Sequence, residues 1–158
     1  LTLSPFWAGL RKYQTTVAKL PLVVYRKAAD GGRTRATDHP AYRLLHERPN
    51  PGQSRAAFFE FLIKEYYLHG NALVLIRRDL NRRPVALHPV PWGAVEDVYL
   101  NTDWSKTYKV READGVRYYQ DADTVHVFHF SHDGIRGVSL TEFAAESLGL
   151  HRQVLESA

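Results

Sequence analysis

Hydrophobic positions recur along this chain with two periods, one of three to four residues and one of two. The first period begins after Ser4 and Pro5, a typical helix start, and ends at Pro21. It returns after Ser54, a predicted N-cap, and continues to Gly70, a residue type that often ends helices. The pattern therefore predicts two amphipathic helices. Their stripes are Phe6, Leu10, Tyr13, Val17 and Leu20 in the first, and Phe58, Phe61, Leu62, Glu65 and Tyr66 in the second.

Capping residues predict two further helices. Asp38 is expected to cap a short helix through residues 41–45, which the prolines of residues 48–52 end. Ser139 and Glu142 have the spacing of a capping box and predict the start of a last helix. Its apolar side continues through Ala144, Leu148, His151 and Leu155.

The period of two predicts strands separated by turn residues. The first strand is expected at residues 22–25, before the turn Asp30-Gly31-Gly32. A hairpin is predicted from residues 72–76 and 84–88, joined by a turn at 79–83. The later strands are expected at 95–100, 107–111, 116–119 and 124–130. Because these strands follow one another without regular alternation with helices, we expect an α+β fold, with several helices packed on a mostly antiparallel, meandering sheet.

Length and composition limit the possible classes of protein. The 158 residues, with 44% hydrophobic and 24% charged side chains, predict a single globular domain over residues 1–158. The chain has no cysteine, which excludes disulfides, thiolate metal sites and a cysteine nucleophile. No uncharged run is long enough to span a bilayer, so we expect no membrane partner. Because the chain starts at Leu1 and contains no methionine, we expect it to be part of a longer gene product.

Charge is distributed unevenly along the chain. Residues 1–79 hold 13 Lys and Arg against 6 Asp and Glu, whereas residues 80–158 hold 8 against 11. The basic half could lie near a polyanion or against the acidic half of a neighbouring copy. The alternative is an ordinary solvated surface.

Three closely spaced histidines are the strongest candidates for a metal site. His126, His129 and His132 could together form an open zinc site, as in a metal-dependent hydrolase. However, side chains alternate along a strand, so His126 and His129 are expected on opposite faces. The chain also lacks the glycine motifs that bind phosphate and the elbow of serine hydrolases. We therefore expect no catalytic, metal-binding or cofactor-binding residues, and a protein that is not an enzyme.

Four arginines surround the turn of the predicted hairpin: Arg77, Arg78, Arg82 and Arg83. A projecting loop with four guanidinium groups could contact DNA phosphates or a neighbouring subunit. One alternative function is therefore a basic nucleic-acid-binding module that uses the Arg77–Arg83 hairpin. Another interpretation is a charged edge that prevents strands of different molecules from pairing.

Several fragments, in this order, resemble the portal proteins of tailed bacteriophages. The resemblance extends from about residue 20 to residue 150, and the chain departs from it at Leu140, where relatives often carry proline. The fragments are Leu20-Pro21-Leu22-Val23-Val24-Tyr25, Asp38-His39-Pro40-Ala41-Tyr42-Arg43-Leu44-Leu45, Arg48-Pro49-Asn50-Pro51, Gly70-Asn71-Ala72 and Asp133-Gly134-Ile135-Arg136-Gly137-Val138-Ser139.

The resemblance implies a structural role at one vertex of a phage head. Portal subunits form a ring, typically of twelve copies, through which double-stranded DNA passes during packaging and ejection. The implied partners are other copies of the chain, the terminase packaging motor, the head–tail connector and capsid proteins. The implied location is the virion, with the host cytoplasm as the site of assembly. Residues 1–158 would be the amino-terminal body of such a subunit, with the stem, clip and crown largely absent.

Overall fold

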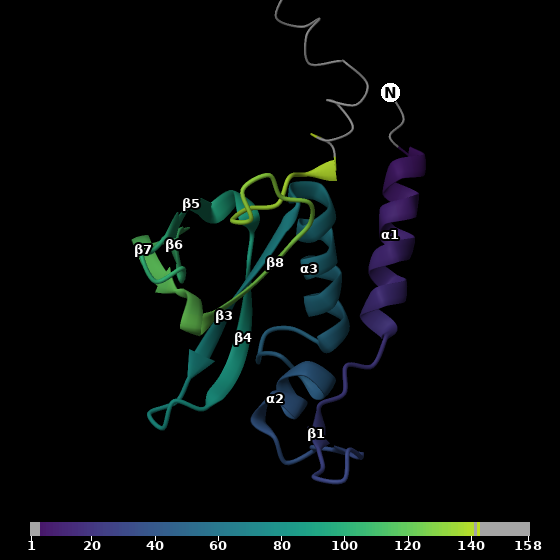
Figure 1. Ribbon diagram of the computed structural model, residues 1–158. Coiled ribbons are helices and arrows are strands. Elements are labelled where there is room, and N and C mark those ends of the chain that lie inside the picture. The colour runs from purple at the N-terminus through teal and green to yellow at the C-terminus, as the bar shows by residue number, and fades with distance from the viewer. Residues whose placement is uncertain (1–3, 141, 143–158) are drawn as a thin grey trace, which may run out of the picture.

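The computed structural model describes residues 4–140 and residue 142. Two long helices, α1 (Ser4–Lys19) and α3 (Arg55–His69), lie side by side next to a set of antiparallel strands (Figure 1). The α+β class expected from the sequence is confirmed. No helix in the described part of the chain is both long and apolar enough to cross a membrane.

Helix α3 is capped at both ends as the sequence predicts. The Ser54 hydroxyl accepts a hydrogen bond from the backbone N–H of Ala57, at 3.2 Å. Gly70 ends the helix with a φ of 71°, in the left-handed region that favours glycine. Phe58 and Glu65 are its buried side chains, whereas Phe61 of the predicted stripe is only half-buried. The helix is therefore correctly predicted, but its most buried face is narrower than the pattern indicates.

Helix α1 is present, but much of its predicted apolar stripe is exposed. Tyr13, Val17 and Leu20 all remain largely open to solvent. The ring of Tyr13 touches that of Tyr67 on α3, with 5.6 Å between the centroids. Among the α1 side chains whose burial the structure describes, those of Leu10 and Ala18 are buried. The spacing of apolar residues predicts a helix face but not which part of the protein covers that face. The sequence therefore could not predict that the stripe of α1 is exposed.

Arg55, the first residue of α3, holds the end of α1 in place. Its guanidinium group donates to the carbonyl oxygens of Ala18 at 2.8 Å and of Leu45 at 3.1 Å, and also to that of Leu20. The last carbonyls of a helix have no partner within the helix. Arg55 therefore satisfies groups that the end of α1 leaves unpaired.

The first strand is displaced from its predicted position at residues 22–25. Strand β1 (Tyr25–Lys27) pairs with β2 (Arg33–Arg35) in a small separate sheet. The turn at Gly31, with a φ of 84°, sets this register. Both strands are exposed. Their position is therefore decided by pairing across the turn and not by the burial of apolar side chains.

The short helix after residue 38 has a different cap from the one predicted. Helix α2 (Pro40–Tyr42) is capped by His39, whose Nδ1 accepts from the N–H of Ala41 at 3.2 Å, and it continues as a π-helical turn, η1 (Arg43–Glu47). Asp38 instead forms an ion pair with Arg26 at 2.9 Å, which lowers the pKa of Asp38. The cap prediction at Asp38 was wrong because a cation on β1 competes for its carboxylate.

The remaining strands form two three-stranded antiparallel sheets. The central sheet has the order β4-β3-β8, formed by β4 (Pro84–Val90), β3 (Asn71–Arg78) and β8 (Thr124–Phe128). Between β4 and β8 the chain makes a second sheet, with the order β5-β6-β7. Its strands are β5 (Val95–Leu100), β6 (Lys106–Glu112) and β7 (Gly115–Gln120), and the short helical turns η2 (Trp92–Ala94) and η3 (Asp121–Asp123) flank it.

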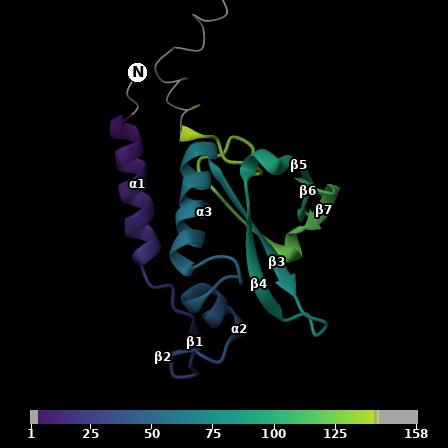
Figure 2. The ribbon, with the colours of Figure 1, turned by 180° about the vertical axis from the view of Figure 1, so that it is seen from behind.

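The central sheet is covered differently on its two faces. The second sheet lies on one side of it and α3 on the other, as the reverse view makes clear (Figure 2). Alternate residues of β3 therefore enter two cores. The core toward the second sheet contains Leu73, Leu75, Val90, Val98, Tyr108 and Val110, and the core toward α3 contains Leu44, Phe58, Val74 and Leu87.

The last predicted helix begins as expected. The Ser139 hydroxyl accepts from the backbone N–H of Glu142 at 3.0 Å, which is one half of the predicted capping box. The rest of this predicted helix, with Ala144, Leu148, His151 and Leu155, lies outside the described residues.

Candidate nucleic-acid interface

The hairpin between β3 and β4 is organised by Asp79. One carboxylate oxygen of Asp79 accepts from the N–H groups of Asn81 and Arg83, at 2.9 and 2.8 Å. The backbone of Asp79 pairs with Arg82 and Arg83, each at 2.9 Å. Leu80 stands fully exposed at the tip, and Arg82 has a φ of 61°. The turn is therefore a defined structure that projects from the sheet.

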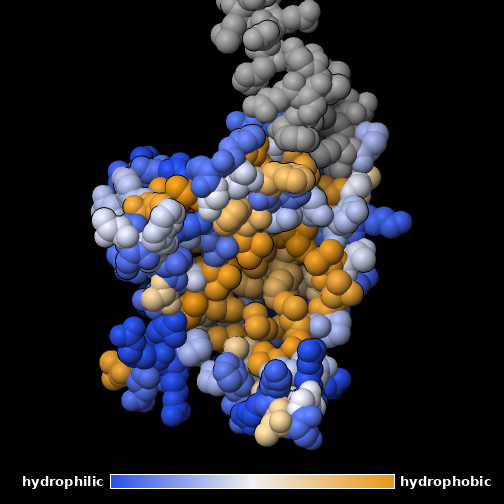
Figure 3. Space-filling view, viewed as in Figure 1, coloured by the Kyte–Doolittle hydropathy of each residue, from blue (hydrophilic) through white to orange (hydrophobic). Residues whose placement is uncertain are grey.

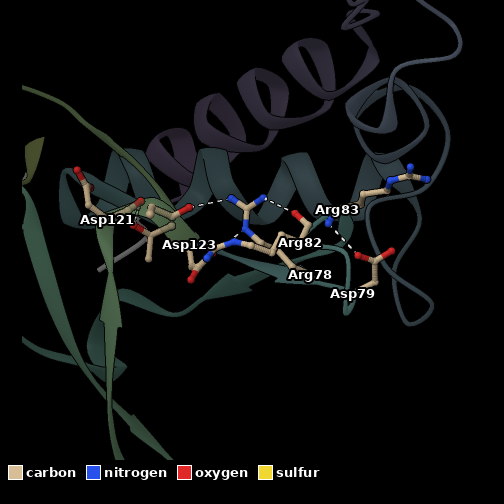
Figure 4. Close-up of polar contacts among 8 residues, drawn as sticks. Arg78, Asp79, Arg82, Arg83, Asp121 and Asp123 are labelled. Carbon is tan, nitrogen blue, oxygen red and sulfur yellow. Dashed lines mark hydrogen bonds and ion pairs between the residues drawn. The ribbon is translucent and has the colours of Figure 1, made fainter.

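Arg78 connects this hairpin to the rest of the molecule. Its Nε donates to Asp123 at 2.6 Å and its Nη2 to the carbonyl of Ala122 at 2.8 Å. Its Nη1 donates to the carbonyl of Arg82 at 3.2 Å. Figure 4 shows the Arg78 guanidinium group reaching between Asp123 and the hairpin backbone. Since its donors are engaged, Arg78 is a structural residue that fixes the hairpin on η3.

The other three arginines are more open. Arg82 and Arg83 are exposed, and within the described residues their guanidinium groups form no hydrogen bond or ion pair. The side chain of Arg83 points away from the contact between Arg78 and Asp123 (Figure 4). Arg77 lies on the opposite face of β3 from Arg78, where its charge acts on Tyr119 of β7. Two guanidinium groups at the hairpin end are thus available to an outside partner.

The structure therefore brings the four predicted arginines to one end of the molecule but gives them different roles. Exposed arginines on a projecting turn can bind phosphate oxygens without reading a base sequence. Asp121 and Asp123 of η3 lie beside the same hairpin and reduce its positive potential. The arrangement suits weak, sequence-independent contact with a polyanion, and contact with DNA stays a prediction.

A second organised site, which sequence reasoning did not identify, surrounds the side chain of Asn71. Asn71 is 1% exposed and uses both ends of its amide. Its Nδ2 donates to the carbonyls of His69 and Gly137, both at 2.7 Å. Its Oδ1 accepts from the N–H of Gly137 at 2.7 Å and lies 3.0 Å from Nε2 of His126. We call Gly70, Asn71, His126 and Gly137 the Asn71 cluster.

The glycines of this cluster allow two backbone segments to touch. A Cβ on Gly137 would overlap the carbonyl oxygen of Gly70, and a Cβ on Gly70 would overlap the carbonyl of Val138. The N–H of His129 also donates to the carbonyl of Gly70 at 2.8 Å. Two of the fragments that carry the family resemblance, around Gly70-Asn71 and Gly137-Val138, are therefore one unit in space.

Asn50, in another of these fragments, has the same kind of role. Its Nδ2 donates to the carbonyl of Leu87 at 2.8 Å and to Gln53 at 2.9 Å, and its Oδ1 accepts from Gly52 at 3.0 Å. Asn50 is 6% exposed. Both buried asparagines thus hold loops onto strands of the central sheet, and neither is presented to a ligand.

The histidine cluster considered as a metal site is divided between different surroundings. The ring of His126 stacks on Trp92, with 5.2 Å between centroids, whereas His129 packs against Tyr66 of α3. Burial, with a smaller contribution from the charge of Lys106, lowers the pKa of His126 to about 4. Within the described residues, no group of three or more His, Cys, Asp or Glu side chains could hold a metal ion.

Comparison with known proteins identifies the family. The model of the phage portal protein family matches residues 4–158. This chain belongs to the phage portal protein family. The comparison with curated proteins gave no match.

Solved structures support the fold of this portal protein chain. A chain from the neck of an empty gene transfer agent particle, computed with C6 symmetry, is 25% identical, with a TM-score of 0.74, and the match covers 92% of this chain. A chain from the neck of the native particle, computed with C12 symmetry, is 21% identical over 92% of this chain, with a TM-score of 0.59. An HK97-family phage portal protein from Corynebacterium diphtheriae is 14% identical over 100% of this chain, with a TM-score of 0.59.

The matched part is less than half of each of these solved chains. It covers 39% and 37% of the two neck chains and 47% of the portal protein from Corynebacterium diphtheriae. The fold and the family follow from these matches. The activity and partners of a whole portal protein do not follow from them.

Proposed function

We propose that residues 1–158 form the amino-terminal body of a portal subunit that assembles with copies of itself into a ring at one vertex of a phage head. The ring, with the twelve copies implied by the family resemblance, serves as a conduit for double-stranded DNA during packaging and ejection. The terminase motor docks on it during filling, and the head–tail connector docks afterwards. The subunit is made in the host cytoplasm and stays in the virion.

One observation carries this proposal, namely the match of the portal family model to residues 4–158. The neighbour from a particle neck computed with C6 symmetry supports a ring, since a neck of that symmetry is itself annular. The character of the described surface agrees with a structural protein. Its organised polar groups, around Asn71, Asn50 and Arg78, donate to backbone carbonyls of other segments and so hold backbone segments together.

The ring is tested by negative-stain electron microscopy of the complete gene product, with rotational symmetry counted in class averages. Closed rings with a central channel are the expected result. Uniform monomers or dimers at every protein concentration and salt concentration would contradict the proposal. In that case the chain would share only its fold with ring-forming portals.

Within this function, we assign phosphate contacts to the hairpin end, through Arg82 and Arg83. Their guanidinium groups have no partner among the described residues, which leaves their charge available to a polyanion. This is also the observation behind the second candidate function, a basic nucleic-acid-binding module that acts without a ring. The two candidates differ in whether duplex binding needs assembly.

Duplex DNA binding, measured against salt concentration, tests this assignment. Replacing Arg82 and Arg83 by Ala should weaken binding and reduce the slope of log K against log salt by about 2, one unit for each lost phosphate contact. The matched control replaces Arg33 and Arg35, another exposed pair, on β2, and removes the same charge elsewhere. If both double variants bind alike, the effect is one of net charge and the hairpin has no special role.

A further inference from the structure

Strand β8 is an edge of the central sheet. The order of that sheet is β4-β3-β8, and no strand of the described chain pairs with the outer side of β8. The N–H of His129 donates to the carbonyl of Gly70 on the inner side, at 2.8 Å. Because backbone groups alternate in direction along an antiparallel strand, those of His126 and Phe128 point outward. Among the described residues, these outward groups have no hydrogen-bond partner.

The other edge of the same sheet is covered. On β4, the N–H of Leu87 donates to the carbonyl of Pro49 at 2.8 Å, and the carbonyl of Leu87 accepts from the side chain of Asn50 at 2.8 Å. At the end of β8, the N–H of Val138 donates to the carbonyl of Phe130 at 2.7 Å. An uncovered edge is a template for a further strand. Within the described chain, that template is the outer side of β8 itself.

An apolar groove lies beside this edge. It has a volume of about 380 Å³ and is lined by residues of α1, η1, α3, β3, β4 and β8. The hydrophobic area at the centre of the face in Figure 3 lies over these elements. Val125 and Val127 of β8 line the groove and are 44% and 51% exposed. A strand added to β8 would therefore cover apolar side chains as well as pair backbone groups.

The segment between α1 and β1 has the composition of a strand but lies in no sheet. The sequence predicts a strand over residues 22–25, yet β1 begins only at Tyr25. The backbone groups of Leu22 and Val23 form no hydrogen bond in the part of the chain that the structure describes. Leu22 and Tyr25 are 44% and 52% exposed. The molecule thus contains a strand-forming segment and a sheet edge that both lack a partner strand.

Both ends of this segment are held by other parts of their own chain. The carbonyl of Leu20 accepts from Arg55, the first residue of α3. The carbonyl of Val24 accepts from the N–H of Ala36, which follows β2, at 2.9 Å. The edge of β8 is therefore left to the same segment of a second copy. Since donor and acceptor are different surfaces, such a contact is head-to-tail, the type that can close into a ring.

Charge favours one direction of pairing. Strand β1 continues the segment with the basic residues Arg26 and Lys27, and η3, directly before β8, contains Asp121 and Asp123. In an antiparallel arrangement, Lys27 of one copy would lie beside η3 of the other, whereas a parallel arrangement would separate them. Lys27 and Asp121 form no ion pair within the described residues, so both charges are available for this contact.

We propose that residues 22–25 of one copy add as an antiparallel strand to the outer edge of β8 of a neighbouring copy. With Lys27 opposite Thr124, the alternation of side chains places Leu22 on the groove side of the sheet, two positions along from Val127. The added strand pairs with the outward backbone groups of β8 and covers the groove. This inference rests on the proposed function, because it describes a contact between copies in the ring.

Cysteine cross-linking of the full-length protein tests the contact, because the described chain contains no cysteine of its own. Leu22→Cys with Val127→Cys places two thiols about 7 to 8 Å apart across two copies, within reach of a short bismaleimide. The matched control is Leu22→Cys with Val85→Cys, because Val85 lies on β4, at the opposite edge of the sheet, and is 45% exposed. Denaturing electrophoresis and peptide mass spectrometry distinguish cross-links between copies from those within one copy.

The Val127 pair is expected to give at least five times more cross-linked product between copies than the Val85 pair. Equal yields, or cross-links only within one copy, would overturn the proposal. Class averages of the same protein before cross-linking report separately on the ring. Closed rings without the expected cross-link would refute this contact but not the ring, whereas the cross-link without rings would support the contact and contradict the ring.

Amide hydrogen exchange of β8 provides a test without a cross-linker. In the full-length protein, Leu22→Asp should remove the added strand and accelerate exchange in a β8 peptide at least three-fold, because the N–H groups of His126 and Phe128 lose their partners. Unchanged exchange of a β3 peptide shows that the sheet itself is intact. The control is Leu80→Asp, the same change at the exposed tip of the β3–β4 hairpin. Equal β8 exchange in the two variants would show that residue 22 does not cover this edge, and the proposal would be wrong.

Discussion

The Asn71 cluster and the arginine hairpin stand at opposite ends of β3 and are built in opposite ways. Around Asn71 every polar atom of the amide has a partner and the backbone segments touch through glycines. At the hairpin, Arg82 and Arg83 are exposed, and their guanidinium groups have no partner among the described residues. A buried polar network is costly unless it is fully satisfied, whereas exposed charges cost little.

The Asn71 cluster therefore stabilises the fold, whereas the hairpin arginines are available to an outside partner. The fragments Gly70-Asn71-Ala72 and Asp133 to Ser139, which resemble the portal family, meet in the Asn71 cluster and act as structural joints. The hairpin arginines belong to none of those fragments. The fragments that carry the resemblance are therefore different from the residues to which we assign phosphate contacts.

The largest loss of stability is expected at the contact between the backbone segments around Gly70 and Gly137. Gly137→Ala should destabilise the protein by about 3 kcal/mol or more, because its new Cβ would overlap the carbonyl of Gly70 and come within 2.9 Å of the backbone nitrogen of His129. Denaturant titration measures the change in the free energy of unfolding. The control is Gly93→Ala, since a Cβ there would meet nothing within 4 Å.

A loss below about 1 kcal/mol for Gly137→Ala, or equal losses for the two glycine variants, would break the comparison. It would mean that the segments around Gly70 and Gly137 can move apart without cost. The Asn71 cluster would then be a loose contact rather than a joint.

The sequence predicted the elements of this joint but not the joint itself. The end of α3 at Gly70 and the cap at Ser139 are local signals, set by backbone conformation and a hydrogen bond to a near neighbour. The contact between Asn71 and Gly137 spans 66 positions, and no local pattern encodes such a pairing. The only local indication was an asparagine directly after a helix-ending glycine. The same pair of residues is equally typical of an ordinary turn.

For the hairpin arginines, the sequence predicted their common location but not their separate roles. A turn between two apolar runs was evident, so the four arginines were correctly grouped at one end of the molecule. Their roles depended on Asp123, which lies 45 positions from Arg78. The same competition between distant partners explains why Asp38 pairs with Arg26 and does not cap α2.

The next largest effect is a pH dependence of stability that comes from His126. Its pKa is about 4 in the folded protein, against an ordinary value of 6.5, because burial disfavours the charged ring. Between these values the unfolded chain binds a proton that the folded chain does not, so the free energy of unfolding should fall as the pH decreases from about 7 to 4. The loss from this residue is at most about 3 kcal/mol.

Urea titrations at several pH values measure this loss. His126→Gln should flatten the dependence, whereas His88→Gln, which removes an exposed imidazole, should leave it unchanged. Asp133 does not interfere, since its pKa of about 2, lowered chiefly by backbone N–H groups of Arg136 and Ile135, restricts its contribution to a lower pH range. Equal slopes for both histidine variants would show that the Asn71 cluster admits a charge without penalty.

The smallest effect distinguishes the arginines of the hairpin from one another. Arg78→Ala should lower the free energy of unfolding by about 1 kcal/mol, because it removes an ion pair with Asp123 and two hydrogen bonds to carbonyls. Arg83→Ala should change it by less than about 0.5 kcal/mol, since the Arg83 side chain has no partner in the described chain. Thermal and urea unfolding of the two variants measure the difference. If Arg83→Ala costs as much as Arg78→Ala, the Arg83 side chain is part of the fold, and its assignment to an outside polyanion loses its basis.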